Sequence, residues 1–243
     1  MSASACFGEQ SRLRPPIGGL NHIGVGLKTN VYIDGFNLYF AIKFSPYKWL
    51  DLSSLCRNLL PKHTINLIRY FTAHVKPLPH DLGVRTRQDF YLRALKTLQD
   101  LELHDNGEFV SWDKLMPQSP LAYVRGKKKS PNKVNVLKTE EKGSDVNLAS
   151  WLLTDCFNGC FDYAVIISND SDLATPIEIV VQQYHKSVKV INPDKPKYAS
   201  KKLARVSTSN FITIHPWVYS QSQFPVTLTD AIGAFTKPPR WYV

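Results

Sequence analysis

Four aspartates stand where segments of the chain end or begin. Asp170 and Asp172 lie in "SNDSDLATP", which directly follows the apolar run "FDYAVIIS". Asp34 follows the short apolar run "VYI", and Asp145 lies in "KGSDV" in the first turn of a predicted helix. In open parallel sheets, ligands bind where the chain leaves the carboxyl ends of the strands. We therefore expect these four carboxylates to meet at one edge of a sheet.

Carboxylates that meet in this way repel one another unless a cation neutralises them. A set of hard oxygen ligands suits Mg²⁺ or Mn²⁺, which also bind substrate phosphates. Asn37, three residues after Asp34, is placed to orient that carboxylate or a water molecule at the metal. The pattern predicts a metal-dependent site for phosphodiester chemistry.

Each of these residues also has a structural explanation. Asp145 would stabilise a helix N-terminus by about 0.3 to 1 kcal/mol through the helix dipole. Asp170 can cap the turn or helix that follows it, Asp34 can be a turn residue before a glycine, and Asn37 can cap the first helix. Their shared position at strand ends favours the metal site.

Strand patterns and helix patterns alternate along the segments that position these aspartates. Strands are predicted at residues 31–33, 65–75, 101–112, 133–139, 163–168 and 187–192. Helices are predicted at residues 36–44, 51–60, 84–101, 143–157 and 173–185, the fourth with Ser144 as its N-cap. This alternation predicts an α/β fold around a mainly parallel sheet.

The domain organisation is predicted from length and composition. We expect a poorly ordered tail at residues 1–29, one domain at residues 30–215 and a C-terminal extension at residues 216–243 that packs on the domain. No apolar run approaches the roughly 18 residues of a membrane helix, so no membrane partner is expected. Four scattered cysteines and the lack of a secretory signal favour the cytoplasm. A homo-oligomer is left open.

Positive charge dominates the chain, with a formal net charge of +10. Such a balance favours polyanionic partners such as nucleic acid. The segment "RGKKKSPNK" at residues 125–133 holds five cations and no acid. A run of this kind is otherwise a solvated loop, as Lys142 beside two glutamates is otherwise a solvated side chain. The predicted nucleic-acid-binding residues are Arg125, Lys127, Lys128, Lys129, Lys133 and Lys142.

Three sequence blocks together resemble a known family. "YIDGFN", "KGSDVNLASWLLTD" and "VIISNDSDLATPI", in that order, are similar to the signature blocks of the NYN domain, a branch of the PIN-like nucleases. The resemblance runs from about Asn30 to Pro193, and "FYLRAL", "LKTEEKGSD", "SQFP" and "KPPRW" are similar to a bacterial subgroup. Asn169 stands where many members have glycine.

The resemblance implies a fold and an activity. The fold would be a PIN-like three-layer α/β/α sandwich, and the activity an endonuclease dependent on Mg²⁺ or Mn²⁺, usually acting on RNA. Residue by residue, it makes four positions the acidic cluster and a fifth the polar neighbour: Asp34, Asp145, Asp170, Asp172 and Asn37.

Our sequence-based interpretation is an endoribonuclease in which water attacks the phosphodiester and the metal stabilises the leaving oxygen. DNA remains an alternative substrate. One rival is a regulatory protein that binds nucleic acid with the same fold but does not cut it, although four carboxylates would repel phosphate unless metal were present. Another is a small-molecule phosphatase with Asp34 as nucleophile. That chemistry commonly uses a second acid two residues later, where Phe36 stands.

Overall fold

The computed structural model describes residues 27–77, 81–121 and 131–241, so most of the tail predicted at residues 1–29 lies outside the described residues. Its strands are β1 (Lys28–Asp34), β2 (Thr64–Ala73), β3 (Leu101–Pro117), β4 (Lys133–Lys142), β5 (Tyr163–Ile167), β6 (Ser187–Asn192), β7 (Ile212–Thr213), β8 (Thr227–Asp230) and β9 (Gly233–Thr236).

Seven α-helices and three short 3₁₀ helices connect these strands within the described residues. The α-helices are α1 (Gly35–Ile42), α2 (Leu52–Leu59), α3 (Val84–Leu95), α4 (Ser144–Phe157), α5 (Ala174–Gln182), α6 (Lys201–Val206) and α7 (Pro216–Gln221). The 3₁₀ helices are η1 (Ser171–Leu173), η2 (Pro196–Tyr198) and η3 (Pro239–Trp241).

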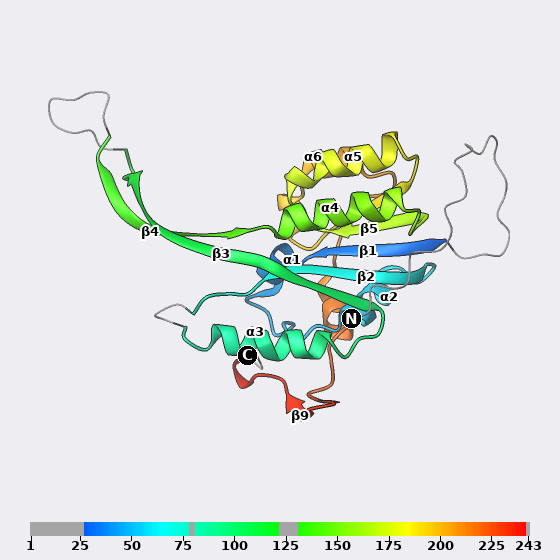
Figure 1. Ribbon diagram of the computed structural model, residues 1–243, viewed down its shortest axis with the longest axis horizontal. Coiled ribbons are helices and arrows are strands. Elements are labelled where there is room, and N and C mark those ends of the chain that lie inside the picture. The colour runs from blue at the N-terminus through cyan, green and yellow to red at the C-terminus, as the bar shows by residue number, and fades with distance from the viewer. Residues whose placement is uncertain (1–26, 78–80, 122–130, 242–243) are drawn as a thin grey trace.

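The main sheet of the described chain has seven strands in the order β4-β3-β2-β1-β5-β6-β7. Every neighbouring pair is parallel except β3 and β4, which are antiparallel. Helices α4, α5 and α6 lie on one side of this sheet and α3 on the other (Figure 1). The predicted α/β/α architecture around a mainly parallel sheet is confirmed.

Two separate apolar cores hold the layers together, because successive strand residues point to opposite faces. In β1, Val31 and Ile33 belong to the core beneath α1, α2 and α3, whereas Tyr32 belongs to the core beneath α4 and α5. In β5, Ile167 and Ile166 divide in the same way. The last residue of β1, Asp34, is thereby fixed between two packed layers.

The C-terminal segment closes over the first of these cores. The indole Nε1 of Trp49 donates to the Pro225 carbonyl at 2.8 Å, and its ring contacts Phe224, Phe235 and Trp241. Trp241 also contacts Tyr91 of α3, with ring centres 6.0 Å apart, so the end of the described chain packs against this helix. The division of the chain at residue 216 remains a prediction.

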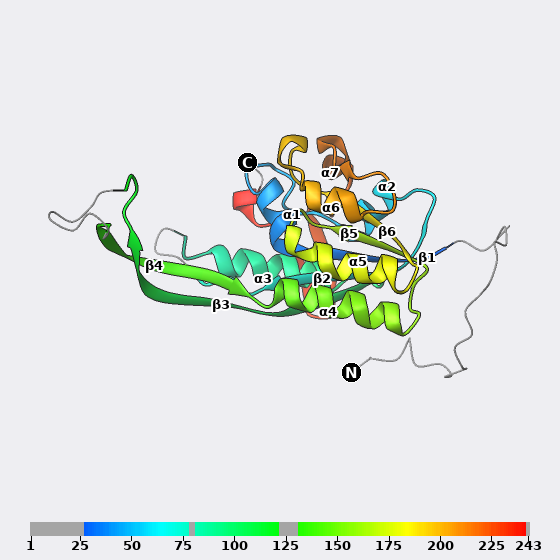
Figure 2. The same ribbon diagram turned by 90° about the horizontal axis from the view of Figure 1, so that it is seen from above.

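A long β-ribbon extends from the sheet. Beyond Gly107, β3 leaves β2 and pairs only with β4, in a register that runs from Glu108–Lys142 to Pro117–Lys133. Figures 1 and 2 both show this ribbon projecting away from the layered body. Because its first strand continues a parallel strand of the sheet, the ribbon leaves from the edge at which β1 and β5 end.

Helix α3 is shorter than predicted. The sequence pattern suggested a helix over residues 84–101, but α3 ends at Leu95 and turns lead to Leu101, the first residue of β3. The carbonyl of Asp100 already accepts from the Ile68 amide at 2.8 Å, so pairing with β2 replaces the last helical turn. No described helix is long and apolar enough to span a bilayer.

Candidate nuclease site

The first carboxylate, Asp34, ends β1 and caps α1. It is buried, and it accepts hydrogen bonds from the Asn37 backbone N–H at 3.0 Å and from Asn37 Nδ2 at 2.6 Å. A third hydrogen bond comes from the Ser168 hydroxyl at 2.9 Å. Burial raises the pKa of Asp34, and these hydrogen bonds to its charged form oppose that rise. Asn37 therefore both caps the helix and orients the carboxylate.

The loop after β5 supplies the next two carboxylates. Asp170 caps the 3₁₀ turn η1 and accepts from the Asp172 backbone N–H at 2.9 Å. The hydroxyl oxygen of Ser168 accepts from the Asp170 backbone N–H at 3.0 Å while donating to Asp34. Ser168 therefore joins the ends of β1 and β5. The sequence-based prediction omitted it because a serine at a strand end carries no distinctive signal.

Asn169 connects this loop to the segment after β6. Its backbone N–H donates to Asn37 Oδ1 at 3.2 Å, its Nδ2 donates to the Tyr198 carbonyl at 2.8 Å, and its Oδ1 accepts from the Ser200 backbone N–H at 2.8 Å. Among the described non-glycine residues only His185 has a positive φ, so position 169 does not require glycine. Asparagine here fixes the loop through its side chain.

The fourth carboxylate, Asp145, lies in the first turn of α4. The predicted N-cap was wrong: the cap is Gly143 at φ 106°, and Ser144 is the first helical residue. The Glu141 side chain accepts from the Ser144 backbone N–H at 3.1 Å and from its hydroxyl at 2.8 Å. A carboxylate from β4 thus satisfies the helix start, where the sequence pattern suggested a serine hydroxyl.

The four carboxylates interact electrostatically. The pKa of Asp145 is raised to about 7, mainly by burial and in addition by four neighbouring negative charges, those of Asp34, Asp170, Glu141 and Asp172. Segments distant in sequence therefore bring their carboxylates within reach of one another's charge.

The donor set has the right chemistry for a hard divalent cation, since carboxylate oxygens are the ligands that Mg²⁺ and Mn²⁺ prefer. Its side chains are spread apart: among the described residues, no three histidine, cysteine or acidic side chains are grouped closely enough to hold a metal ion. Mutual repulsion is consistent with this spacing. The assignment of these residues as metal ligands remains a prediction.

Asp155, also on α4, takes no part in this cluster. Its Oδ2 accepts from the Tyr32 hydroxyl at 2.7 Å and from Arg69 Nε at 2.8 Å, and all three side chains are buried between α4 and the sheet. A buried charge requires such a partner. Asp155 is therefore part of the packing that holds α4 on the sheet.

The predicted nucleic-acid-binding residues divide between described and undescribed parts of the chain. Arg125, Lys127, Lys128 and Lys129 lie outside the described residues. Lys133 and Lys142 stand at opposite ends of β4, nine residues and roughly 30 Å apart along a strand. Lys142 is therefore near the helix that carries Asp145, whereas Lys133 is at the far end of the ribbon.

One face of the ribbon combines an indole with cations. Lys138 Nζ and Lys142 Nζ each lie 5.7 Å from the centre of the Trp112 ring. Lys142 Nζ also lies 3.9 Å from Glu140, so its charge is shared between a carboxylate and the ring. Flat rings beside lysines are typical of surfaces that bind single-stranded nucleic acid.

A row of aromatic rings on α1 and the turn that follows it lies beside this surface. Phe36 contacts Phe109 of β3 edge-on, with ring centres 5.4 Å apart. Phe40 is 58% exposed and Phe44 is 92% exposed, and Lys43 Nζ lies within 4.9 Å of the centres of both rings. The sequence-based prediction missed this row, although phenylalanine at every fourth position was a signal that could have found it.

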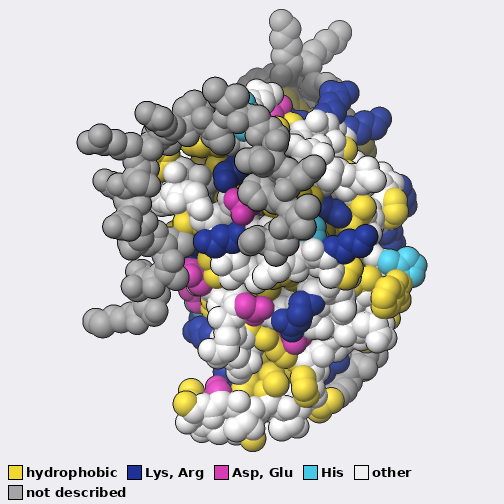
Figure 3. All heavy atoms as spheres, turned by 90° about the vertical axis from the view of Figure 1, so that its right-hand side faces the viewer, with side chains coloured by type: hydrophobic (Ala, Val, Ile, Leu, Met, Phe, Trp, Pro, Cys, Tyr) yellow, Lys and Arg dark blue, Asp and Glu magenta, His cyan; other side chains and the backbone are white. Residues whose placement is uncertain are grey.

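The opposite end of the molecule has a different surface. In the view from the right-hand side of Figure 1, lysine and arginine side chains alternate with acidic ones over the described part of that face (Figure 3). The aromatic and cationic residues discussed above lie instead on the ribbon, on α1 and on the turn after α1.

Comparison with known proteins places the chain in a family. The NYN domain pattern matches residues 28–215. The chain belongs to the NYN domain family. Members of this family have a PIN-like, nuclease-type fold, in agreement with the sheet order and layers described above.

One relative and one solved structure extend the comparison. The chain is 32% identical over 187 residues to "6-hydroxy-3-succinoylpyridine 3-monooxygenase HspA" of Pseudomonas putida (strain DSM 28022 / S16), covering 68% of this NYN chain and 58% of that protein. The chain therefore spans little more than half of that relative. A crystal structure of a protein of unknown function from Vibrio parahaemolyticus RIMD 2210633 is similar in fold, with a TM-score of 0.50 and 16% identity over 79% of this chain and 94% of that one.

Proposed function

We propose that the chain is a metal-dependent endoribonuclease with Asp34, Asp145, Asp170 and Asp172 as its acidic site. The observation that carries the proposal is the arrangement of these aspartates at the ends of β1 and β5 and at the start of α4, with Ser168 joining Asp34 to the Asp170 backbone. Carboxylates that repel one another in the folded chain are a site for a cation. Membership of a nuclease-type family agrees with this assignment.

Mg²⁺ or Mn²⁺ would be held by these four carboxylates. When bound, the ion supplies charge neutralisation at the phosphate and activation of water. The chain's own residues prepare the site: Asn37 and Ser168 fix both oxygens of Asp34 by hydrogen bonds, and Ser168 also fixes the Asp170 backbone. Such orienting hydrogen bonds typically contribute about 10- to 100-fold to metal affinity or activity.

The reaction needs no nucleophile from the protein. A water oxygen attacks phosphorus, the bond from phosphorus to the 3′-oxygen breaks, and the 3′-oxygen takes up a proton. The products are a 5′-phosphate and a 3′-hydroxyl.

RNA is the proposed substrate because the surface beside the carboxylates suits a flexible single strand. Phe40 and Phe44 offer exposed rings on which bases can stack, with Lys43 beside both for a phosphate. Base stacking on an aromatic side chain contributes about 1 to 3 kcal/mol per base. On the other side of the site, the ribbon offers the Trp112 ring, with Lys138 and Lys142 beside it and both paired with Glu140.

A single assay tests the proposal. Purified protein is incubated with end-labelled single-stranded RNA and with DNA of the same sequence, in Mg²⁺, Mn²⁺ or EDTA. We expect RNA cleavage only with metal. Asp172→Asn should reduce the rate about 100-fold or more. The fold should remain intact, because the Asp172 carboxylate makes no hydrogen bond or ion pair with the described residues.

The matched control is Asp162→Asn. This aspartate lies next to the opposite end of β5, where it accepts from the Lys28 backbone N–H and pairs with Lys186, so its variant loses a carboxylate away from the acidic site. Its variant should cleave RNA at the parental rate. Cleavage that persists in EDTA, or full turnover by Asp172→Asn, would contradict the proposal, and RNA that binds but stays intact under every condition would favour the regulatory alternative.

The second candidate function is chemistry on a small aromatic compound. The relative from Pseudomonas putida is named for oxygenation of a substituted pyridine, and this chain has a pocket of about 420 Å³ whose lining includes the two residues after Asp34. Because the chain spans only 58% of that relative, this function is secondary here.

A further inference from the structure

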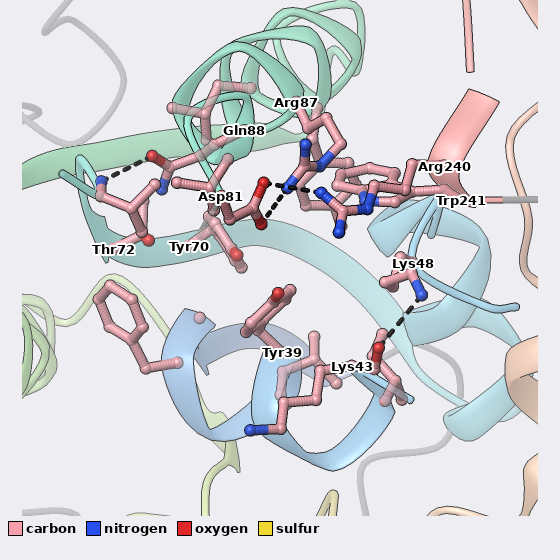
Figure 4. Close-up of a pocket in the computed structure, with 18 of the residues that line it drawn as sticks. Tyr39, Lys43, Lys48, Tyr70, Thr72, Asp81, Arg87, Gln88, Arg240 and Trp241 are labelled. Carbon is pink, nitrogen blue, oxygen red and sulfur yellow. Dashed lines mark hydrogen bonds and ion pairs between the residues drawn. The ribbon is translucent and has the colours of Figure 1, made fainter. Parts of the chain in front are cut away.

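A pocket lies between α1, β2, α3 and the C-terminal η3. Its volume of about 420 Å³ falls within the roughly 300 to 1,000 Å³ of typical small-molecule sites. Figure 4 shows Tyr39 on α1 at the lower side of this space and Tyr70 of β2 above it, with Arg87 and Arg240 converging on Asp81 in the upper part of the view.

Aromatic side chains make up much of the pocket wall. Tyr39 stands at the mouth, 40% exposed, whereas Tyr70 is buried. The Tyr91 hydroxyl donates a hydrogen bond to the Leu50 carbonyl at 2.9 Å, so the Tyr91 ring forms an apolar part of the pocket wall. Trp241 also lines the pocket. Aromatic rings from separate elements make a site that suits a flat ring.

Positive charge exceeds negative charge around the same space. The lining has four cationic residues and one acidic residue, namely Lys43, Lys48, Arg87, Arg240 and Asp81. Arg87 Nη2 lies 2.5 Å from one oxygen of Asp81, and Arg240 Nη1 lies 2.9 Å from the other. Two guanidinium groups thus share one carboxylate.

The surroundings of Lys48 show the same excess of positive charge. Its Nζ donates to the Lys43 carbonyl at 3.1 Å. Burial lowers the pKa of Lys48, and the positive charges of Lys237 and Arg87 lower it further. An anion in this pocket would therefore relieve repulsion among the cations.

The pocket wall is continuous with the backbone that positions Asp34. Gly35 and Phe36 both line the pocket. A Cβ added at Gly35 would lie 2.6 Å from the Phe71 carbonyl oxygen and 2.7 Å from Tyr70 Cζ, so only glycine fits between Asp34 and this wall. A bound ligand would lie beside the carboxylate site.

We infer that this pocket binds a planar aromatic ring that carries one carboxylate or phosphate group, with the ring against Tyr39 and Tyr70 and the anion toward Arg87 and Arg240. A free aromatic acid and a nucleotide share this chemistry. The inference does not rest on cleavage of RNA, because binding can be measured without metal or turnover.

Isothermal titration of the full chain in EDTA distinguishes the two sources. Nicotinate is compared with neutral nicotinamide, and adenosine 5′-monophosphate with neutral adenosine, while inorganic phosphate tests charge alone. We expect at least one anionic ring to bind about 10-fold more tightly than its neutral counterpart and than phosphate. Binding of nicotinate but not of adenosine 5′-monophosphate would identify a site for a small aromatic acid. Binding of the nucleotide but not of nicotinate would identify a subsite for the RNA substrate. Equal binding within both pairs, or no saturation by any ring up to about 10 mM, overturns the inference.

Two variants and two matched controls locate the binding. Tyr39→Ala removes the ring at the mouth, and Arg240→Gln removes a cation that is 65% exposed. Tyr184→Ala is the control for the first, because Tyr184 is 39% exposed on a different part of the surface. Arg57→Gln is the control for the second, because Arg57 is 61% exposed and pairs with Asp100.

Each pocket variant should weaken binding about 10-fold, and each control should leave it unchanged. Circular dichroism and thermal melting verify folding, and Arg240→Gln alone decides the result if Tyr39→Ala does not fold. Unchanged affinity in a folded pocket variant would place the ligand elsewhere and overturn the inference.

Discussion

Replacing Asp145 by asparagine should stabilise the metal-free protein above neutral pH. The pKa of Asp145 is raised from 3.8 to about 7 in the folded chain, first by burial and then by neighbouring carboxylates. The native state therefore binds this proton more tightly than the unfolded state does. The protonated Asp145 carboxyl makes its full contribution to the free energy of unfolding below about pH 4. This contribution is lost as the pH rises through about 7 and the carboxyl ionises.

The magnitude follows from the size of the shift. About three pKa units correspond to roughly 4 kcal/mol, and because Asp145 is only partly buried, solvent screening reduces this to about 2 kcal/mol. Loss of the favourable charge at the start of α4 subtracts about 0.5 kcal/mol. At pH 8, the free energy of unfolding of Asp145→Asn should thus be about 1 to 2 kcal/mol higher than that of the parent. At pH 4, the two proteins should have similar free energies of unfolding.

Urea unfolding in EDTA at several pH values measures this difference. Glu178→Gln is the control, because it makes the same change from carboxylate to amide at an exposed position on α5, away from the acidic site. Addition of Mg²⁺ should stabilise the parent more than Asp145→Asn, since a ligand of the native state raises the free energy of unfolding. A difference that is the same at pH 4 and pH 8, or a less stable variant at pH 8, would refute the reasoning.

Two further predictions concern the reaction and the basic segment. RNA products should carry 5′-phosphates, as measured by mass spectrometry of the fragments, and 2′,3′-cyclic ends would contradict attack by water. Replacing Lys127, Lys128 and Lys129 by alanine should flatten the dependence of RNA affinity on salt by about 1 to 2 units of slope, at about 0.7 per phosphate contact, while turnover at saturating RNA is retained. An unchanged slope would mean that the segment is an exposed linker.

The positions of the aspartates at strand ends could be predicted from sequence, because the end of a strand is a local feature of the sequence. Asp34 follows an apolar run, and so does the loop that carries Asp170. Once the sheet is parallel, both must reach the same edge. The architecture could be predicted for the same reason, because apolar residues recur with a different period in strands and in helices.

The features that the sequence did not predict depend on contacts between distant segments of the chain. The Ser144 prediction failed because Glu141 of β4 competes for the same helix terminus. The pocket could not be predicted because Tyr39, Arg87 and Arg240 come from three separate segments, and nothing local in any of them indicates a shared cavity. Helix α3 was predicted too long because pairing with β2 outweighs local helix propensity after Leu95.

The ribbon has a mechanical consequence for the carboxylates. Gly143 is the single residue between the end of β4 and the first residue of α4, the helix that carries Asp145. The other strand of the ribbon, β3, continues directly into the sheet beside β2, so the ribbon is held at the base of both strands. Helix α4 is in turn joined to β1, the strand that ends at Asp34, by the hydrogen bond from the Tyr32 hydroxyl to Asp155. A load on the far end of the ribbon would therefore be carried by the same packed elements that hold Asp145 and Asp34, so the ribbon and the acidic site rest on one rigid support.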